Sequence, residues 1–432
     1  MQVGDLNLEG PTSGSRGSVY SPPNGGCRAW MLVLACFVIN LCNAVVSLML
    51  VSNIIRDFTN EFGSDKANDI AEAFTVVRKI GVVVAAILMV PLGYRIVGII
   101  GCGMYGVGLF VSSWLTKDQD DFAAFLLGGL SGLGSSFLLL TAIVPPLEYF
   151  SSKRLRAISI VRIGEIIGHT VILFVYIPLS IVKEAHYKWE INFRYQLIPV
   201  GVALLCCATL KPLELKSSNS KTNLVSRLAG TVDWKLFKDL VLYLILILIF
   251  MDHIGKPMSR KQYISLLEEM ESDDINAKII TVIIPYLGEV AGLILMVLCC
   301  CWKNRKIGTV LILIGVINAL IGILACVAPS LKTFGLVAMF GALFGVSKGV
   351  FNTLLDSSVP DIFGRGHVRI VEGLFGLMIG IAQLVISPAY EEILDTYEKD
   401  PWKMGFYVGG GVLIASGVLA ILTRFRKPQD YK

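Results

Sequence analysis

Four charged side chains lie deep inside apolar stretches of about 20 residues. Arg162 and Glu165 occur in LRAISIVRIGEIIGHTVILF, Glu289 in IIPYLGEVAGLILMVL, and Lys348 in FGALFGVSKGVFNTLL. A charge at the centre of a bilayer costs roughly 2.5–3.5 kcal/mol on insertion scales, so such residues usually face a polar cavity or a charged partner. Arginine and lysine could bind an anion in such a cavity, and a glutamate could take up a proton.

The composition supports a membrane setting for these charges. Hydrophobic residues make up 54% of the 432 positions and charged residues only 16%. Runs of about 20 apolar residues predict twelve transmembrane helices and an all-α membrane protein. The predicted spans lie near 29–55, 71–92, 96–115, 122–149, 155–182, 195–210, 239–255, 275–301, 307–328, 333–356, 368–390 and 404–423.

The longest polar interruption divides the spans into six and six. We therefore expect a six-helix bundle at 29–210, a linker at 211–238 and a second six-helix bundle at 239–423. Residues 1–28 are rich in Gly, Ser and Pro and predict a flexible tail, and 424–432 form a second tail. The segments SSKRLR, WKNRK, the linker and RFRKPQDYK are basic, whereas TKDQDD and EEILDTYEKD are acidic. The positive-inside rule then places the linker and both termini in the cytoplasm, and the basic charge needs no nucleic acid to explain it.

This layout resembles the major facilitator superfamily, in which substrate binds midway between two six-helix halves. The resemblance implies that the third and sixth helices of each half face lipid. Spans 3, 6, 9 and 12 contain no Asp, Glu, Lys or Arg, as that arrangement requires. Asp252, Asp356 and Glu372 stand near the ends of predicted spans, where they could equally well reach the membrane interface.

Several segments resemble the monocarboxylate transporter family. They are AWMLVLACFVIN, GYRIVGIIGCGMYGVGLFVSSW, GGLSGLGSSF, EYFSSKRLRAISIVRIGEIIG and TVDWKLFKDLVLYL. The family's signature before span 5 is matched by Tyr149, Phe150, Lys153 and Arg154. The resemblance implies an alternating-access transporter of the plasma membrane, and some members of the family need a single-span accessory glycoprotein.

The chain departs from that family where its proton-lactate members carry their charges. Aligned with them, Glu289 keeps the acid of span 8, while Leu48 and Leu293 replace the cations of spans 1 and 8. The entry motif is reduced to Gly25-Gly26-Cys27-Arg28-Ala29-Trp30. We therefore expect a divergent member whose substrate differs from lactate.

Charges elsewhere in the spans are candidates for the missing roles. Arg162, Glu165 and His169 share one helical face, because they stand at i, i+3 and i+7. Two interpretations of the first pair remain open: Arg162 anchors a substrate carboxylate, or Arg162 and Glu165 form an ion pair that packs the bundles together. Arg78 and Lys79 point about 100° apart on a helix, so only one can face a narrow cavity.

The candidate residues fall into three roles. The substrate-binding candidates are Arg162, Lys348, Arg78 and Glu165. Glu289 is the proton-coupling candidate, and its alternative is a permanently ionised partner of Lys348. His169, Asp252 and Glu372 are candidates for gating or secondary roles.

Two classes of function fit these patterns. The first is a secondary active or facilitative transporter of a small organic anion or zwitterion, with proton coupling left open. The second is a membrane receptor or scaffold that keeps the fold without transport. The sequence lacks a phosphate-binding glycine loop, a metal-ligand spacing and a nucleophile elbow, so we expect no cofactor, metal or catalytic group.

Overall fold

The computed structural model describes residues 25–55, 59, 63–115, 119–172, 189–211, 234–269, 275–298, 307–331, 333–396 and 401–424. Within these ranges the regular elements are all helices. Nine helices in this part of the chain are long and apolar enough to cross a membrane. The predicted tails 1–24 and 425–432 and most of the linker, 212–233, lie outside the described residues.

The first half contains six predicted spans in five long helices. These are α1 (Cys27–Asn53), α3 (Ser64–Ser112), α5 (Ser131–Tyr149), α6 (Arg154–Val171) and α8 (Trp189–Thr209). Helix α4 (Asp120–Ala123) and a π-helix (Ala124–Leu130) lead into α5. Helix α3 holds two spans because Pro91 removes a backbone donor and Gly93 adopts a φ of 76°, which breaks the helix direction.

The second half contains one helix for each of its six predicted spans. These are α10 (Leu240–Glu269), α11 (Ile275–Leu298), α12 (Ile307–Val327), α13 (Phe334–Ile362), α14 (Val368–Thr396) and α15 (Pro401–Thr423). Helices α10 and α13 extend further than predicted, so Asp252 and Asp356 lie well inside their helices and not at their ends. Helix α6 ends at Val171, and the rest of the predicted fifth span lies outside the described residues.

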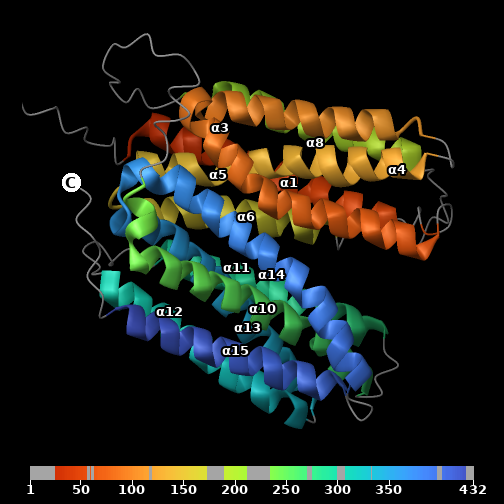
Figure 1. Ribbon diagram of the computed structural model, residues 1–432, viewed down its shortest axis with the longest axis vertical. Coiled ribbons are helices and arrows are strands. Elements are labelled where there is room, and N and C mark those ends of the chain that lie inside the picture. Colours follow the sequence, from red (N-terminus) through yellow and green to blue (C-terminus); the bar gives the residue numbers. More distant parts are fainter. Residues whose placement is uncertain are drawn as a thin grey trace, which may run out of the picture.

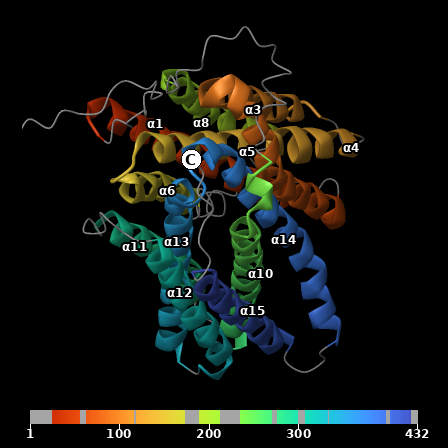
Figure 2. The ribbon, with the colours of Figure 1, turned by 60° about the vertical axis from the view of Figure 1, so that its left-hand side comes forward.

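The two halves lie side by side and approach most closely at one end. In Figure 1 this is the left-hand end, where α5 ends and α6 begins, and the halves diverge toward the right. Figure 2 shows the helices of the second half steeply inclined to those of the first. Helix α14 packs against α3 and helix α11 against α6, and smaller contacts join α13 to α6 and both α13 and α14 to α5 across the halves.

The spans without charges carry apolar side chains on their outer surfaces. Ile198 and Leu205 on α8 are 65% and 70% exposed, and Leu320 on α12 is 56% exposed. The second part of α3 and helix α15 likewise expose Phe110 and Leu422. Such surfaces are suited to contact with lipid, as the charge distribution predicted.

Small residues allow close approach both within and between the halves. Within the halves, Gly134 of α5 lies against Gly101 of α3, and Gly345 of α13 lies against the Pro285 carbonyl of α11. Between the halves, a Cβ at Gly376 of α14 would lie 2.6 Å from the Val82 Cβ of α3. The contact of α3 with α14 therefore depends on glycine, as is common for helices that pack in lipid.

Candidate transport site

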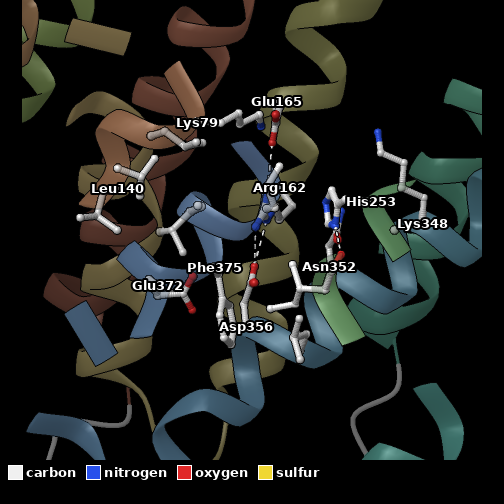
Figure 3. Close-up of a pocket in the computed structure, with 18 of the residues that line it drawn as sticks. Lys79, Leu140, Arg162, Glu165, His253, Lys348, Asn352, Asp356, Glu372 and Phe375 are labelled. Atoms are coloured by element: carbon white, nitrogen blue, oxygen red, sulfur yellow. Dashed lines mark hydrogen bonds and ion pairs between the residues drawn. The ribbon is translucent and has the colours of Figure 1, made fainter. Parts of the chain in front are cut away.

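A cavity of about 210 Å³ lies between the two halves near the middle of the helices. Helices α3, α5 and α6 of the first half and α10, α11, α13 and α14 of the second contribute side chains to it. Besides His253, the titratable side chains of its lining are three basic residues and four acidic ones: Lys79, Arg162, Lys348, Glu165, Glu289, Asp356 and Glu372. Figure 3 shows Arg162 and Glu165 of the first half meeting Asp356 of the second, with Glu372 beside them.

Arg162 forms the strongest link across the cavity. Its Nη2 and Nε atoms donate to Oδ2 of Asp356, at 2.6 and 3.1 Å, and so join α6 to α13. Its Nη1 atom donates to Oε2 of Glu165, one turn along its own helix, at 3.4 Å. The guanidinium thus holds one carboxylate of each half, as the dashed lines of Figure 3 show. In this conformation Arg162 joins the halves through Asp356, whereas its contact with Glu165 stays within α6.

Glu165 is approached by cations of α3 as well. The Nη2 atom of Arg78 lies 4.0 Å from Oε1 of Glu165. Lys79 lines the cavity and points toward Glu165 (Figure 3), whereas Arg78 is not among the lining residues. The expected division between the two consecutive cations therefore holds, with Lys79 as the cavity residue.

Lys348 and Glu289 form a second ion pair, within the second half. The Lys348 Nζ atom donates to Oε2 of Glu289 at 2.8 Å. This contact matches the alternative in which Glu289 is an ionised partner of Lys348. The Lys348 side chain is 36% exposed and Glu289 is 8% exposed, so the pair lies at the cavity edge with its carboxylate inward.

Glu372 differs from the other carboxylates of the cavity. It is 6% exposed, and its Oε1 atom is buried without a hydrogen-bond partner among the described residues. In Figure 3 its carboxylate stands apart from the pair of Arg162 with Asp356. A buried charge without a partner is costly, so this position requires a proton or a cation.

Helix α10 brings a third ion pair close to the cavity. Lys256 Nζ lies 2.7 Å from Oδ1 of Asp252 and 4.1 Å from the centroid of the Phe351 ring. His253 lines the cavity, and its Nδ1 atom lies 3.7 Å from Asp252. Asp252 is 1% exposed and lies behind the lining, where it holds Lys256.

His169 also lies outside the cavity lining. Its ring meets Tyr286 of α11 edge to face, with centroids 6.4 Å apart. The predicted face of α6 is therefore divided between two environments. Arg162 and Glu165 face the cavity, and His169 contacts the other half.

Two ion pairs join the halves where they approach most closely. Arg154 Nη1 donates to Asp361 Oδ1 at 2.7 Å and to the Ser357 carbonyl at 3.2 Å. Arg369 binds both oxygens of Glu148, at 2.8 and 3.1 Å, and donates to the Met89 carbonyl. We call this region, defined by Glu148, Arg154, Asp361 and Arg369, the closed end.

A larger cavity, about 520 Å³, lies in the first half at the surface of α1 and α8. Its lining is mostly apolar and includes Arg28 and Lys211 but no carboxylate. Its lining residues lie between Arg28 and Lys211, the first residue of the linker, and none belongs to the second half. The smaller, charged cavity is therefore the one placed where an alternating-access carrier binds its substrate.

The structure brings together five of the eight candidate residues. Arg162, Glu165, Glu289, Lys348 and Glu372 line one cavity, while Arg78, His169 and Asp252 lie behind it or beside it. The candidate set omitted Lys79, His253 and Asp356, which also line the cavity. Their charge inside an apolar helix was the available signal, and for Asp356 a predicted span that ended too early concealed it.

Comparison with solved structures shows the fold. The E. coli fucose:proton symporter FucP superposes with a TM-score of 0.66 over 93% of this chain and 100% of its own, at 15% identity. The proton:xylose symporter XylE gives a TM-score of 0.64 over 92% and 94% of the two chains, at 14% identity. The chain therefore has the fold of the major facilitator superfamily, with two halves of six transmembrane helices.

Similarity to curated proteins extends over nearly the whole chain. Mouse monocarboxylate transporter 12 is 24% identical over 96% of this chain and 88% of its own length. Rat monocarboxylate transporter 13 is 22% identical over 95% and 94%. No family model matches the sequence. Over nearly its whole length the chain is thus similar to monocarboxylate transporters, and its apolar helices and fold are those of a multi-pass membrane protein.

Proposed function

We propose that this protein carries a small organic anion or zwitterion across the membrane by alternating access between its two halves. One observation carries the proposal: a cavity midway along the helices is lined by charged groups from both halves. Each half contributes cations and carboxylates, so rocking of the halves would change the partners of every charge. A solute that bears a carboxylate could bind among the cations of this cavity.

The cavity favours a charged solute over a neutral sugar. FucP and XylE share the fold and are named for fucose and xylose. A sugar offers hydroxyl groups and no net charge, and it could not offset the cost of unpairing buried ions. The seven Lys, Arg, Asp and Glu side chains of the lining therefore support a solute of the monocarboxylate class suggested by the names of the curated relatives.

Proton coupling forms part of the proposal, with facilitative transport as its alternative. FucP and XylE are both named as proton symporters. Four carboxylates in a single small cavity provide groups on which a proton could be carried. Glu289 is one of them, although its ion pair with Lys348 must open before it can change its protonation state.

We also propose the plasma membrane as the site of action, with both termini in the cytoplasm. The basic segments support this orientation under the positive-inside rule, and the family resemblance supports the membrane. In this orientation the closed end faces the cytoplasm, because Arg154 belongs to the basic segment SSKRLR. A single-span accessory glycoprotein would be a partner of the surface form, and coexpression with such proteins tests this.

Reconstitution into liposomes tests the proposed function. The purified full chain is screened with radiolabelled L-lactate, pyruvate, aromatic amino acids and creatine, with fucose and xylose as neutral comparators, in the presence and absence of a proton gradient. We expect uptake of at least one charged solute and none of the sugars. Arg162→Ala should abolish that uptake, while Arg95→Ala, an exposed cation outside the cavity, should not. A folded protein that carries no solute would support the receptor or scaffold instead.

A further inference from the structure

Glu372 is the carboxylate of the cavity that the described structure leaves without a partner. Its Oε1 atom is buried and accepts no hydrogen bond, and none of the ion pairs described for the cavity includes it. Arg162, the cation nearest to it in Figure 3, already donates its hydrogen bonds to other carboxylates. Two of its nitrogens donate to Asp356 and the third donates to Glu165.

The elements around Glu372 supply no free positive charge at its carboxylate. Asp356 of α13 and Arg162 of α6 are the charged groups that act on it most directly. Its own helix carries Arg369, which is held at the closed end by Glu148 of α5.

The other helices around the cavity offer Glu372 no partner either. Helix α10 presents His253 to the same cavity, and its Lys256 is held by Asp252. On α3, Lys79 points toward Glu165 and not toward Glu372 (Figure 3). On α15, no ionisable residue belongs to the lining.

Lys79 is the basic side chain of the cavity that has no ion-pair partner. Glu165 already has Arg162 and Arg78 as partners, and Lys348 is held by Glu289. Within the described part of the chain, Lys79 makes no hydrogen bond and no ion pair within 4.0 Å. The cavity thus contains one carboxylate and one ammonium group that are both unpaired and that lie on opposite halves.

We propose that Glu372 is the proton-binding group of this carrier and that Lys79 binds the substrate carboxylate. The inference rests on the proposed function, and it assigns coupling to α14 and not to the acid of α11. With Arg78 included, the cavity and its wall hold four cations and four carboxylates. A proton on Glu372 neutralises one carboxylate and leaves one positive charge in excess. A substrate carboxylate at Lys79 then restores neutrality, so one proton accompanies one anion.

The step balances without any further reactant. The Glu372 carboxylate takes a proton from water when the cavity is open to one side, and one O–H bond forms. After the halves rock, the anion leaves Lys79, and the same O–H bond breaks as the proton returns to water on the other side. The ion pair of Arg162 with Asp356 can persist or open during the cycle without a change in this balance.

Infrared difference spectroscopy tests the proton site without a known substrate. The full chain in lipid nanodiscs is compared between alkaline and acidic buffer, and the carboxylic acid carbonyl band of a buried group is followed. We expect the wild type to gain this band, Glu372→Gln to lose the gain, and Glu289→Gln to keep it. Glu372→Met, an apolar replacement of similar length, provides a second variant if the glutamine form does not fold. A band that persists in both Glu372 variants would overturn the assignment.

Transport separates this inference from the proposed function. With radiolabelled pyruvate as the probe, we expect a proton gradient to stimulate wild-type uptake. Glu372→Gln should lose this stimulation yet retain exchange of labelled for unlabelled pyruvate, and Lys79→Gln should lose both activities. Stimulation that survives in Glu372→Gln would refute the coupling role. If no solute in the wider screen is carried, the proposed function fails, while the infrared result still decides whether Glu372 binds a proton.

Discussion

The closed end and the central cavity both join the halves through arginine–carboxylate pairs, but they differ in how completely the pairs are satisfied. At the closed end, Arg154 and Arg369 each bind a carboxylate and also a backbone carbonyl of the opposite half. In the cavity, Arg162 donates hydrogen bonds to the carboxylates of Asp356 and Glu165, and none of its nitrogens donates to Glu372. The closed end is thus complete without a ligand, whereas the cavity is not.

This difference assigns separate tasks to the two regions. A complete set of charge-assisted hydrogen bonds stabilises one conformation, and it must break when the closed end opens. A buried charge that lacks a partner instead favours the binding of a proton or ligand that pairs with it. A ligand that binds in the cavity could therefore contribute the free energy needed to open the closed end, since only differential binding shifts such an equilibrium.

The largest expected effect follows from breaking the pair in the cavity. Asp356→Ala removes the main partner of Arg162 and leaves a buried guanidinium with Glu165 alone. Loss of one partner of a buried pair costs about 3–5 kcal/mol. We expect a marked drop in the thermal unfolding temperature in detergent and no transport. Asp356→Asn, which keeps the shape and an acceptor oxygen, should retain much of the stability; equal destabilisation by both variants would contradict the electrostatic explanation.

A variant at the closed end should shift the equilibrium between the closed and open conformations more than it lowers the free energy of unfolding. Glu148→Ala leaves Arg369 with only the Met89 carbonyl, and we expect it to disfavour the closed state by about 2–3 kcal/mol. Hydrogen exchange should then speed up at the end of α13, near Ser357. Asp361→Ala should have a smaller effect, because Asp361 is 42% exposed and its pair is partly hydrated. The comparison fails if Asp361→Ala increases exchange more than Glu148→Ala.

The contact of α3 with α14 provides a test that involves no charge. Gly376→Val would force a side chain toward Val82, and overpacking of this kind costs about 1–3 kcal/mol. We expect slower transport, because the halves could no longer approach as closely. Gly103→Val is the matched control, since a Cβ there meets nothing within 4 Å. Slower transport in both variants would point to helix propensity and not to the contact between the halves.

The sequence predicted the architecture well because hydropathy is a local property. Each span must satisfy its own backbone in lipid, so twelve apolar runs and one long polar linker were enough to indicate two halves of six helices. Buried charges such as Arg162 and Lys348 were recognisable for the same reason: a charge within an apolar run stands out.

Which charges meet could not be predicted in the same way. Arg162 and Asp356 are 194 residues apart, and Arg154 and Asp361 are 207 apart. A single sequence carries no signal for such pairs, because they depend on how the halves dock. The absence of a partner at Glu372 is likewise a property of the packed cavity, and no local pattern distinguishes it from Glu289.

The smallest expected effect concerns the pair of Lys348 with Glu289. Lys348 is 36% exposed, so water screens the pair, and we expect Lys348→Met to lower the free energy of unfolding by only about 1 kcal/mol. Removing Lys348 also leaves Glu289 without its partner, which should make it a second proton-binding carboxylate. The infrared difference spectrum of Lys348→Met should therefore gain a band that Lys348→Met/Glu289→Gln lacks. If the single variant shows no new band, the Lys348 ammonium does not determine the charge of Glu289, and the contrast between paired Glu289 and unpaired Glu372 would lose its physical basis.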